Sequence, residues 1–508
     1  MALLGRAGVQ AQAIDLAVER LDPEVVRQAR FVGISVPMHT ALRLGVRVLA
    51  EVKRLAPAAH VCFYGLYAPL NERYLRRAGA DSVIGGEYEE ELVRRAEALL
   101  GPVSESVSES ASKTVSESVS ESVSESETVS ESVSVSETVS VSVSETVSES
   151  VSVSESVTVS ESASVSESKT VSETVSVSET VSVSETASES KSVSLRRITV
   201  IQASTAGLPS LDRYARIVRA DGWEELAGYT EASRGCLYKC RHCPIPAVYD
   251  GRFFAVSREV VLAEIRAQVG EGARHITFGD PDFLNGPRHA LAIARAVHTE
   301  FPELTFDFTA KIEHLLRDRA LLPEFAAFGC NFIVSAVESL SDRVLTILDK
   351  GHTRADIETA LSLVRTAGLV LRPSLVPFTP WSTLTDYLEL VEFIEAHELA
   401  IDPVQLTIRL LVPPGSLLEN HPATRSHLVA LDEGALSYVW RHPDPRMDRL
   451  QREVARAMEA GMARSASQEE LFAEIKRLAW TAAGKKPPAM LRQLHPPTGP
   501  RLSEPWFC

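Results

Sequence analysis

The amino-acid sequence predicts an α/β protein in which two regions of parallel β-sheet flank a long low-complexity tract. Two observations lead to this class. Short β-rich runs alternate with amphipathic helical stretches in residues 31–100 and again from about residue 228 onward, which is the pattern of βα units. A strict two-residue alternation fills the segment between them. We expect an N-terminal α/β domain at 1–101, a linker at 102–194, a barrel-like region at 195–411 and a mostly helical C-terminal extension at 412–508.

The N-terminal region carries three β-like runs that each end in small residues. They cover 31–37, 61–65 and 82–87, and helical stretches at about 40–55, 70–78 and 88–100 separate them. This pattern predicts a doubly wound, Rossmann-like sheet, in which ligands bind outside the carboxyl ends of the strands. Small residues at those ends let a large flat ligand with a phosphate-bearing tail approach the backbone.

The start of the chain departs from this pattern. An amphipathic stretch at 2–8 precedes a strand-like run at 13–18. The usual first strand of such a domain is therefore expected to be absent, with the N-terminus either mis-started or trimmed.

The tract from Val103 to Ser194 places Ser or Thr at every even position and Val, Glu, Ala or Lys at every odd one. Its odd face mixes Val with Glu throughout, so it offers no continuous apolar surface. Low complexity of this kind predicts a disordered linker, and an extended β ribbon or an aggregation-prone tract is the alternative. The tract holds 17 Glu and 3 Lys, so it supplies 14 of the 16 net negative charges of the chain.

Charge and hydropathy exclude some classes of partner. Neither globular region shows a basic run that would indicate nucleic-acid binding, and no run of about 18 apolar residues predicts a membrane span. Crowded thiols without a secretory signal indicate a reducing compartment, so we expect a cytoplasmic protein.

The second β-rich region predicts a partial (βα)6 barrel of the TIM type. Predicted strands cover 229–233, 275–280, 305–310, 332–337, 370–376 and 404–410, and predicted helices include 258–269, 289–300, 356–367 and 385–397. Barrel enzymes place their chemistry at the carboxyl ends of the strands. Beyond the last strand, helices are expected near 447–462 and 467–480.

Three cysteines follow the first predicted barrel strand. Cys236, Cys240 and Cys243 stand in C-x3-C-x2-C spacing on one short loop. Three thiolates with no fourth ligand nearby suit a cubane iron–sulfur cluster with one open iron, whereas structural zinc sites are closed by four protein ligands. Zinc bound by the three cysteines and His242 or His275 is an alternative, and a disulfide is a weaker one. The other cysteines, Cys62, Cys330 and Cys508, form no second C-x2-C.

These residues resemble the radical S-adenosylmethionine (SAM) enzymes, whose signature is C-x3-C-x-aromatic-C, with His242 in the aromatic-type position. The resemblance implies a [4Fe-4S] cluster on Cys236, Cys240 and Cys243. It also implies that the free iron chelates SAM and that an electron from the cluster cleaves SAM to methionine and a 5′-deoxyadenosyl radical. A flavodoxin- or ferredoxin-type electron donor is the expected protein partner.

Polar residues at the other strand ends are candidates for contacts with SAM. Gly279 and Asp280 occupy the place of the family's Gly-Gly-Glu-like motif, which contacts the SAM amino group, although Asp-Pro-Asp-Phe-Leu-Asn is also good turn chemistry. The resemblance implies that Ser335 and Glu338 contact ribose or SAM. Further candidates are Lys311, which would face the SAM carboxylate or a substrate anion in a binding or catalytic role, and Arg372 for the carboxylate. Pairing of Lys311 with Glu338 is the alternative.

Joined to such a barrel, the N-terminal region resembles the cobalamin (B12)-binding domain of B12-dependent radical SAM proteins. The residues that stand where the family's loops meet the corrin and nucleotide tail are Ser35, Met38, His39, Thr40, Gly65, Gly85, Gly86 and Glu87. His39 is not assigned as a cobalt ligand, because the loop after this strand normally cradles the tail.

The chain ends in Glu504-Pro505-Trp506-Phe507-Cys508. This end resembles the tail of a radical SAM subgroup that finishes in Cys-Cys-Ala-Glu-Pro or Cys-selenocysteine-Ala-Glu-Pro (CCAEP or CUAEP). The resemblance implies that Cys508 is the first of that pair, with a selenocysteine codon read as stop, and that it is a catalytic redox or substrate-contacting thiol. An incidental terminal cysteine is the alternative.

The combined resemblance implies a cobalamin-dependent radical SAM methyltransferase that acts on an unactivated carbon of a small-molecule or peptide substrate. Cobalamin-dependent rearrangement or cyclisation is one alternative. A non-catalytic iron–sulfur or metal-binding protein is another. The sequence leaves the substrate open, because loops determine function in such barrels.

Overall fold

The structure is a computed structural model that describes residues 1–100, 203, 207–219, 221–486 and 499–503. It also describes the backbone of short strands at β4 (Thr180–Val181), β5 (Val193–Ser194) and β6 (Arg196–Ile198). The chain divides into two compact units, Met1–Gly101 with Ile198–Cys508, and Pro102–Arg197. Apart from β4 and β5, the alternating tract with its predicted disorder lies outside the described residues. None of the described helices is both long and apolar enough to span a lipid bilayer.

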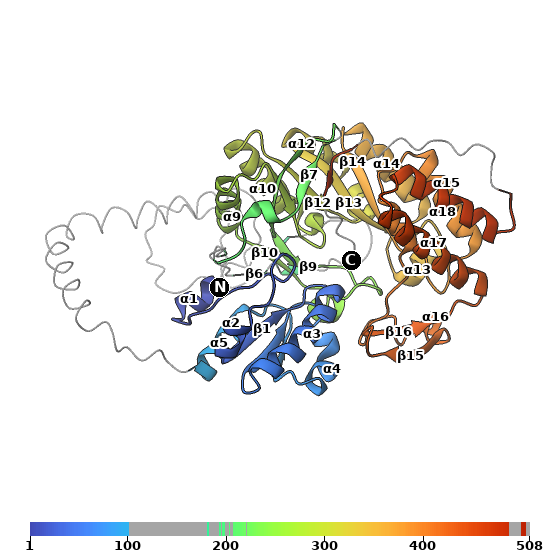
Figure 1. Ribbon diagram of the computed structural model, residues 1–508. Coiled ribbons are helices and arrows are strands. Elements are labelled where there is room, and N and C mark those ends of the chain that lie inside the picture. Colours follow the sequence, from blue (N-terminus) through green and yellow to red (C-terminus); the bar gives the residue numbers. More distant parts are fainter. Residues whose placement is uncertain are drawn as a thin grey trace, which may run out of the picture. The chain divides into compact units, whose positions relative to one another are not determined.

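The N-terminal region contains the three predicted strands in one parallel sheet (Figure 1). They are β1 (Phe31–Ser35), β2 (His60–Tyr64) and β3 (Ser82–Ile84), and the helices are α1 (Ala2–Arg6), α2 (Pro23–Gln28), α3 (His39–Leu55), α4 (Glu72–Arg77) and α5 (Glu89–Leu100). The order β1-β2-β3 follows the chain without reversal. The described strands therefore show one direction of winding, and the predicted doubly wound order stays a prediction.

The strand predicted at 13–18 is also wrong. The backbone turns there instead, because the Asp15 carboxylate accepts a hydrogen bond from the Ala17 N–H at 2.9 Å. An Asx turn of this kind competes with extended structure.

Helices cover both faces of the N-terminal sheet. A Cβ at Gly45 of α3 would lie 3.0 Å from Ile34 and Phe63, while a Cβ at Gly33 of β1 would meet Tyr64 and, at 3.8 Å, Leu92 of α5. Successive strand residues point to opposite faces, so α3 packs on one side and α5 on the other. This arrangement leaves the carboxyl edge of the sheet for a ligand.

The second sheet has the strand order β14-β13-β12-β11-β8-β7-β17. Five parallel strands form its centre in the part of the chain that the structure describes, and two antiparallel strands extend one edge. They are β8 (Glu224–Thr230), β11 (His275–Phe278), β12 (Thr305–Thr309), β13 (Cys330–Glu338) and β14 (Val370–Leu375), with β7 (Arg216–Val218) and β17 (Arg501–Leu502) at the edge. The partial barrel of parallel βα units is confirmed, with one strand fewer than predicted.

Helices connect the parallel strands and flank the sheet (Figure 1). They are α9 (Arg258–Gly270), α10 (Pro287–Glu300), α11 (Ile312–Arg317), α12 (Leu322–Ala327), α13 (Asp342–Leu348), α14 (Arg354–Thr366) and α15 (Leu384–Ala396). Large apolar side chains such as Phe306, Phe308 and Phe325 fill the core between strands and helices with no exposed surface.

The sixth barrel strand, predicted at 404–410, is wrong. Pro403–Thr407 forms a short 3₁₀ helix. Pro403 fits its first turn because proline lacks an N–H, and the Asp402 carboxylate accepts from the Val404 N–H at 3.0 Å. Among the described residues a single parallel bridge, between Phe378 and Arg409, continues the sheet on this side.

The first predicted strand, 229–233, is divided in two. β8 ends at Thr230, and β9 (Ser233–Gly235) then pairs antiparallel with β10 (Phe253–Val256), with α8 (Ile245–Tyr249) between them. The cysteine loop therefore begins directly after β9 and is held between two paired strands.

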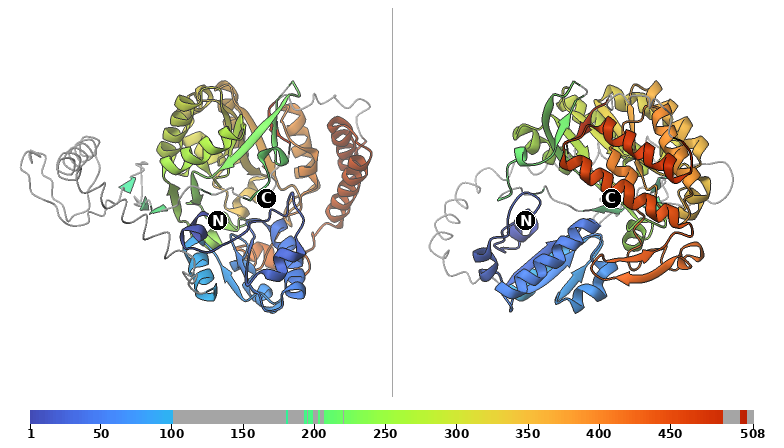
Figure 2. Two further views of the ribbon diagram at one scale, coloured as in Figure 1. Left: turned by 60° about the vertical axis from the view of Figure 1, so that its left-hand side comes forward. Right: turned by 45° about the vertical axis from the view of Figure 1, so that its right-hand side comes forward.

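The C-terminal extension confirms both predicted helices, as α17 (Pro445–Ala463) and α18 (Gln468–Ala482), after the short α16 (Pro422–Arg425). It also contains a hairpin that was not predicted, β15 (Leu428–Asp432) and β16 (Ser437–Trp440). The two long helices lie side by side (Figure 2) and share the barrel's hydrophobic core through residues such as Leu450 and Ile475. The extension is thus part of the barrel domain.

A buried ion pair tests this integration. Lys476 of α18 pairs with Glu395 of α15, and their side chains are only 6% and 15% exposed. Because removing one partner leaves a buried charge unpaired, we expect Lys476→Met to lower the free energy of unfolding by about 3–5 kcal/mol. Chemical denaturation followed by circular dichroism measures this change. The matched control is Arg477→Gln, which breaks an exposed pair with Glu474 and should cost less than about 1 kcal/mol. Equal effects would contradict the prediction.

Candidate active site

A cavity of about 2750 Å³ opens between the barrel and the carboxyl edge of the N-terminal sheet, within one compact unit. Ligand pockets for small molecules reach about 1000 Å³, so this one has room for more than one cofactor and a substrate. The predicted site residues that line it are Ser35, Met38, Thr40, Gly65, Cys236, Cys240, His242, Cys243, Gly279, Asp280, Lys311, Glu338 and Arg372. The structure therefore brings residues from both predicted ligand sites to one space.

The three loop cysteines lie close enough for their charges to interact. Burial raises the pKa of Cys236 to about 11, with further contributions from Asp282 and Cys240. Burial also raises the pKa of Cys243, and the neighbouring Cys236 and Cys240 add to it. Three thiolates in one partly buried place need cationic partners, which a [4Fe-4S] cluster supplies. This donor set fits such a cluster.

The two alternatives for the cysteines have no support in the geometry. In the described ranges no three His, Cys, Asp or Glu side chains converge as they would around a single metal ion. His242 is bonded to Glu338, and His275 is bonded to Asp307 and Thr305. Every described cysteine is free, so the disulfide interpretation is wrong for them.

Glu338 connects the cysteine loop to the end of β13. Its carboxylate lies 3.2 Å from Nε2 of His242 and 3.2 Å from Nζ of Lys350. Burial raises the pKa of Glu338, but Lys350 and His242 outweigh burial and hold the pKa at about 2. The backbone of Glu338 is left-handed, with φ of 63°, which a non-glycine residue adopts only where its surroundings enforce it.

Lys350 is a site residue that sequence reasoning missed. It is 2% exposed and lines the cavity. The available signal was a lysine in the loop between α13 and α14, but a surface lysine there would have looked the same in sequence. The predicted alternative pair of Lys311 with Glu338 is wrong, because Lys311 pairs with Glu313 at 3.0 Å.

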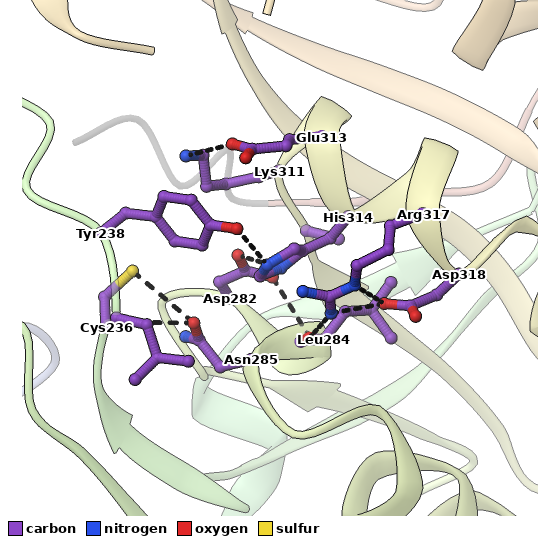
Figure 3. A network of polar contacts seen from close by, with 12 residues as sticks. Cys236, Tyr238, Asp282, Leu284, Asn285, Lys311, Glu313, His314, Arg317 and Asp318 are labelled. Carbon is purple, nitrogen blue, oxygen red and sulfur yellow. Dashed lines mark hydrogen bonds and ion pairs between the residues drawn. The ribbon is translucent and has the colours of Figure 1, made fainter. Parts of the chain in front are cut away.

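A buried polar network supports the loop from its other side. The Tyr238 hydroxyl and Nε2 of His314 are 2.9 Å apart, and Nδ1 of His314 lies 2.7 Å from Asp282. The ammonium of Lys311 lies 3.3 Å from the centre of the Tyr238 ring. Figure 3 shows the Tyr238 hydroxyl directed at His314 with Lys311 beside the ring. The loop is thus anchored to the segments that follow β11 and β12.

Asn285 belongs to the same network and was also missed. Its Oδ1 accepts from the Leu237 N–H at 3.4 Å and lies 3.9 Å from Sγ of Cys236 (Figure 3). Asp282 caps the short 3₁₀ helix Phe283–Asn285 by accepting from the Leu284 N–H at 3.2 Å. The turn chemistry predicted for this segment is confirmed, and the turn positions Asn285 against the loop.

Gly279 and Asp280 lie where β11 meets the cavity. The Asp280 carboxylate accepts from the Ala232 N–H at 2.9 Å and from the Ser233 hydroxyl, and it is 2% exposed. Burial raises the pKa of Asp280 to about 7. A Cβ at Gly279 would fall 1.9 Å from the Tyr229 hydroxyl, so a larger residue here would require the tyrosine ring to move. Asp280 therefore holds the turn that leads into β9 while bordering the cavity.

Two of the predicted site residues, Ser335 and His39, do not line the cavity, because the strand or helix that carries each one directs its side chain elsewhere. Ser335 is fully buried and donates to the Ala310 carbonyl at 2.7 Å, since alternation along β13 directs Val334, Ala336 and Glu338 to the cavity and Ser335 away. His39 starts α3 and packs edge-on against Tyr67 at 6.0 Å.

The predicted loop at Gly85, Gly86 and Glu87 also lies off the cavity. Gly85 packs against Pro69, where a Cβ would come within 2.1 Å, and Gly86 has a positive φ of 68°. Glu87 accepts from the Tyr249 hydroxyl at 3.0 Å and pairs with Arg234 at 3.2 Å. This loop contacts the protein itself.

Arg234 joins the N-terminal domain to the cysteine loop. It lies in β9, two residues before Cys236, and its side chain is 17% exposed. It pairs with Glu87 and Glu89 of the N-terminal domain and, at 2.9 Å, with Glu231. The three carboxylates compensate one partly buried guanidinium.

Comparison with known proteins identifies the central part of the barrel. Residues 230–394 match the Radical SAM superfamily model. These residues form a radical SAM domain. Such a domain takes a [4Fe-4S] cluster and SAM, and the cysteine triad lies inside the matched segment.

The chain is also 26% identical, over 178 residues, to a ribosomal protein uS12 methylthiotransferase of Bacteroides thetaiotaomicron. The aligned part covers 33% of this chain and 40% of the relative. It spans less than half the length of the curated relatives it matches.

Two solved structures resemble the chain beyond this domain. A radical SAM methyltransferase from Kitasatospora setae, TsrM, solved with cobalamin and a [4Fe-4S] cluster, has a TM-score of 0.50 at 15% identity and covers 78% of this chain and 66% of its own. The cobalamin-dependent SAM radical enzyme OxsB, solved without ligands, has a TM-score of 0.57 at 15% identity and covers 95% and 68%. At these identities the likeness concerns the fold.

The C-terminal tail stays a prediction. Cys508 and the tail residues from 504 onward lie outside the described residues, and nothing tests the predicted CCAEP or CUAEP subgroup. The preceding Ser503 is bonded to Arg216 at the edge of the sheet and lines the cavity.

The cluster assignment predicts a sharp difference among the cysteines. Replacing Cys236, Cys240 or Cys243 singly by Ala should abolish stable cluster incorporation, because two thiolates cannot hold the cubane. Iron and sulfide content and visible absorbance after anaerobic reconstitution measure this. The control is Cys330→Ala, since Cys330 is buried in β13 and should leave the cluster intact. Cluster retention in any of the three triad variants would contradict the assignment.

The Glu338–Lys350 pair should show strong energetic coupling. Lys350→Met should lower the free energy of unfolding by about 3 kcal/mol, because it leaves the buried Glu338 carboxylate without its lysine partner. The double variant Glu338→Gln/Lys350→Met should lose less than the sum of the single variants, with a coupling of about 1–3 kcal/mol. Denaturant unfolding of all three variants measures the cycle. Lys239→Met, which removes an exposed pair in the same loop, should leave stability unchanged. Additive single effects would show that the two groups do not interact.

Proposed function

We propose that this protein is a cobalamin-dependent radical SAM methyltransferase that acts on an unactivated carbon. One observation carries the proposal: a single large cavity is lined both by the cysteine loop and by the carboxyl edge of the N-terminal sheet. Ligands of open α/β sheets bind at this edge. Two cofactors held by the two domains would therefore face one another. The likeness in fold to TsrM and OxsB supports this arrangement.

The N-terminal side of the cavity suits a flat, largely apolar cofactor such as the corrin of cobalamin. Ser35 ends β1, Tyr64 ends β2, and Gly65 follows it directly. Gly65 has a positive φ of 103° and would bring any Cβ within 3.3 Å of the Val36 backbone. The rings of Tyr64 and Tyr88, 4.8 Å apart, both line the space. These residues would hold the corrin by stacking and close backbone approach.

No protein ligand to cobalt is assigned. Within the described ranges His242 is the one histidine that lines the cavity, and its Nε2 is bonded to Glu338. His39 faces Tyr67 instead. The protein would therefore bind cobalamin through the shape of the pocket and without a side-chain ligand to the cobalt.

The barrel residues divide into those that hold the cluster and those that bind SAM. Cys236, Cys240 and Cys243 would hold the cluster. Asp280 would accept from the SAM ammonium, and Lys311 would face its carboxylate, because charged groups in a water-poor pocket need charged partners. When bound, the cluster and SAM supply a radical that abstracts hydrogen, and cobalamin supplies a methyl group.

The protein's own residues exclude water and fix orientation. Glu338, Lys350 and Asp280 are each at most 5% exposed, so their charges act in a medium of low polarity, where they are strongest. The Tyr238–His314–Asp282 network keeps the loop in place. A flavodoxin- or ferredoxin-type donor would supply the electron, and a small molecule or peptide would be the substrate.

Product analysis tests the proposal. The cluster-loaded protein is incubated anaerobically with SAM and a reductant, with and without cobalamin, and 5′-deoxyadenosine and S-adenosylhomocysteine are quantified. A methyltransferase uses a second SAM as methyl donor, so S-adenosylhomocysteine should appear only with cobalamin. Formation of 5′-deoxyadenosine alone would favour a cobalamin-dependent rearrangement or cyclisation. Absence of any SAM cleavage would support a non-catalytic iron–sulfur protein and overturn the proposal.

A further inference from the structure

The interior of the barrel contains a second group of polar residues, nearer the amino ends of the strands than the cysteine loop. Strand pairing places Arg372 of β14 beside Val334 of β13, which in turn pairs with Thr309 of β12. Glu338, which contacts the cysteine loop, stands four residues further along β13, or roughly 13 Å at about 3.3 Å per residue. Arg372 therefore starts well below the edge where the cluster would bind.

The surroundings of Arg372 show that its side chain is directed away from that edge. Its guanidinium lies 5.7 Å from the ring of Phe332, a residue still deeper in the strand order. It donates a long hydrogen bond, 3.5 Å, to the Pro500 carbonyl. Arg372 and Phe332 both line the cavity. The guanidinium thus faces the floor of the barrel.

A second arginine enters the same floor from the C-terminal strand. Arg501 of β17 lines the cavity. The adjoining Gly499 packs against Val370 of β14, where a Cβ would lie 3.2 Å away, although β17 is paired to β7 at the far edge of the sheet. The C-terminal segment therefore reaches across from one edge of the half-barrel to the other and brings Arg501 near Arg372.

Among the described residues neither arginine forms an ion pair with a carboxylate, and the polar contact of the Arg372 guanidinium is the Pro500 carbonyl. Two acids lie near enough for their charge to act on Arg372, and each is hydrogen-bonded to another residue through one carboxylate oxygen. Asp307 accepts from Thr277 at 2.7 Å and lies 2.8 Å from Nε2 of His275, and Asp402 caps the 3₁₀ helix at Pro403–Thr407. Burial and the positive charge of Arg501 lower the pKa of Arg372 to about 10 against the opposing influence of both acids. Two like charges held together in a partly buried place favour a bound anion.

We propose that Arg372 and Arg501 form a binding site for an anionic group of the substrate, a carboxylate above all, on the floor of the barrel. The proposal rests on the proposed function, in which the SAM site occupies the cluster edge and the substrate lies below it. Planar guanidinium groups match a carboxylate by two parallel hydrogen bonds. The substrate would then be oriented with its anionic end against the floor and its reacting carbon toward the cofactors.

Binding of a charged probe and its neutral analogue tests the site. Full-length, cluster-loaded protein is titrated calorimetrically with benzoate and with benzamide in the presence of saturating SAM. Benzoate should bind at least about tenfold more tightly than benzamide, because a charge-assisted pair is lost with the amide. Arg372→Gln should remove this preference, Arg501→Gln should reduce it, and Arg372→Lys should retain part of it. Arg477→Gln, an exposed arginine of α18, is the matched control and should keep it.

Each other outcome overturns the proposal. Equal binding of benzoate and benzamide by the unaltered protein would show that Arg372 and Arg501 do not form an anion-binding site. An unchanged preference in Arg372→Gln would place the anion elsewhere. A loss of SAM affinity in Arg372→Gln, measured by titrating the protein with SAM alone, would assign Arg372 to the carboxylate of SAM. Arg372→Lys keeps the charge and guards against misfolding of the Gln variant. The titration does not depend on SAM cleavage, so a failure of the proposed function would be seen separately in the product assay.

Discussion

The ion pairs of the Glu338 carboxylate are the interaction on which the candidate site depends. Glu338 joins three segments that are distant in sequence: its own strand end, Lys350 after α13 and His242 inside the cysteine loop. A buried carboxylate that loses its lysine partner is left as an uncompensated charge, so the contacts of Glu338 tie these segments together. The backbone at Glu338 is left-handed where the register of β13 shifts, a conformation that costs a non-glycine residue free energy. The loop that carries the thiols is therefore tied to the end of β13 and to the segment after α13.

The alternation of the parallel strands decides which other residues take part. Along β13, Phe332, Val334, Ala336 and Glu338 face the cavity, and Ser335 faces the helices. The same alternation directs Arg372 of β14 inward. A polar residue near a strand end is consequently available for chemistry only at every second position. This explains why Ser335 and Glu338, three residues apart, have unrelated roles.

Charge compensation also links the cysteine loop to the N-terminal domain. Arg234 stands two residues before Cys236 and is paired with Glu87 and Glu89, which lie near the start of α5. Tyr249, which follows the loop, donates to Glu87. Glu87 of the β3–α5 loop, which the sequence suggested as a cofactor contact, makes its contacts with other parts of the protein. The cavity is left to the ends of β1 and β2.

The sequence by itself determined the elements whose signals are local. The C-x3-C-x2-C spacing, the strands β11, β12, β13 and β14 and the turn at Asp282 could all be predicted from neighbouring residues, because spacing, alternation and turn chemistry act over short range. Only the tertiary structure decided the partners of the charged residues. Lys350 rather than Lys311 pairs with Glu338, Asp402 and Pro403 replace a sixth strand by a 3₁₀ helix, and the C-terminal strand brings Arg501 toward Arg372. The physical reason is that ion pairs and barrel closure join residues far apart in the chain, and their geometry exists only once the strands have set their register.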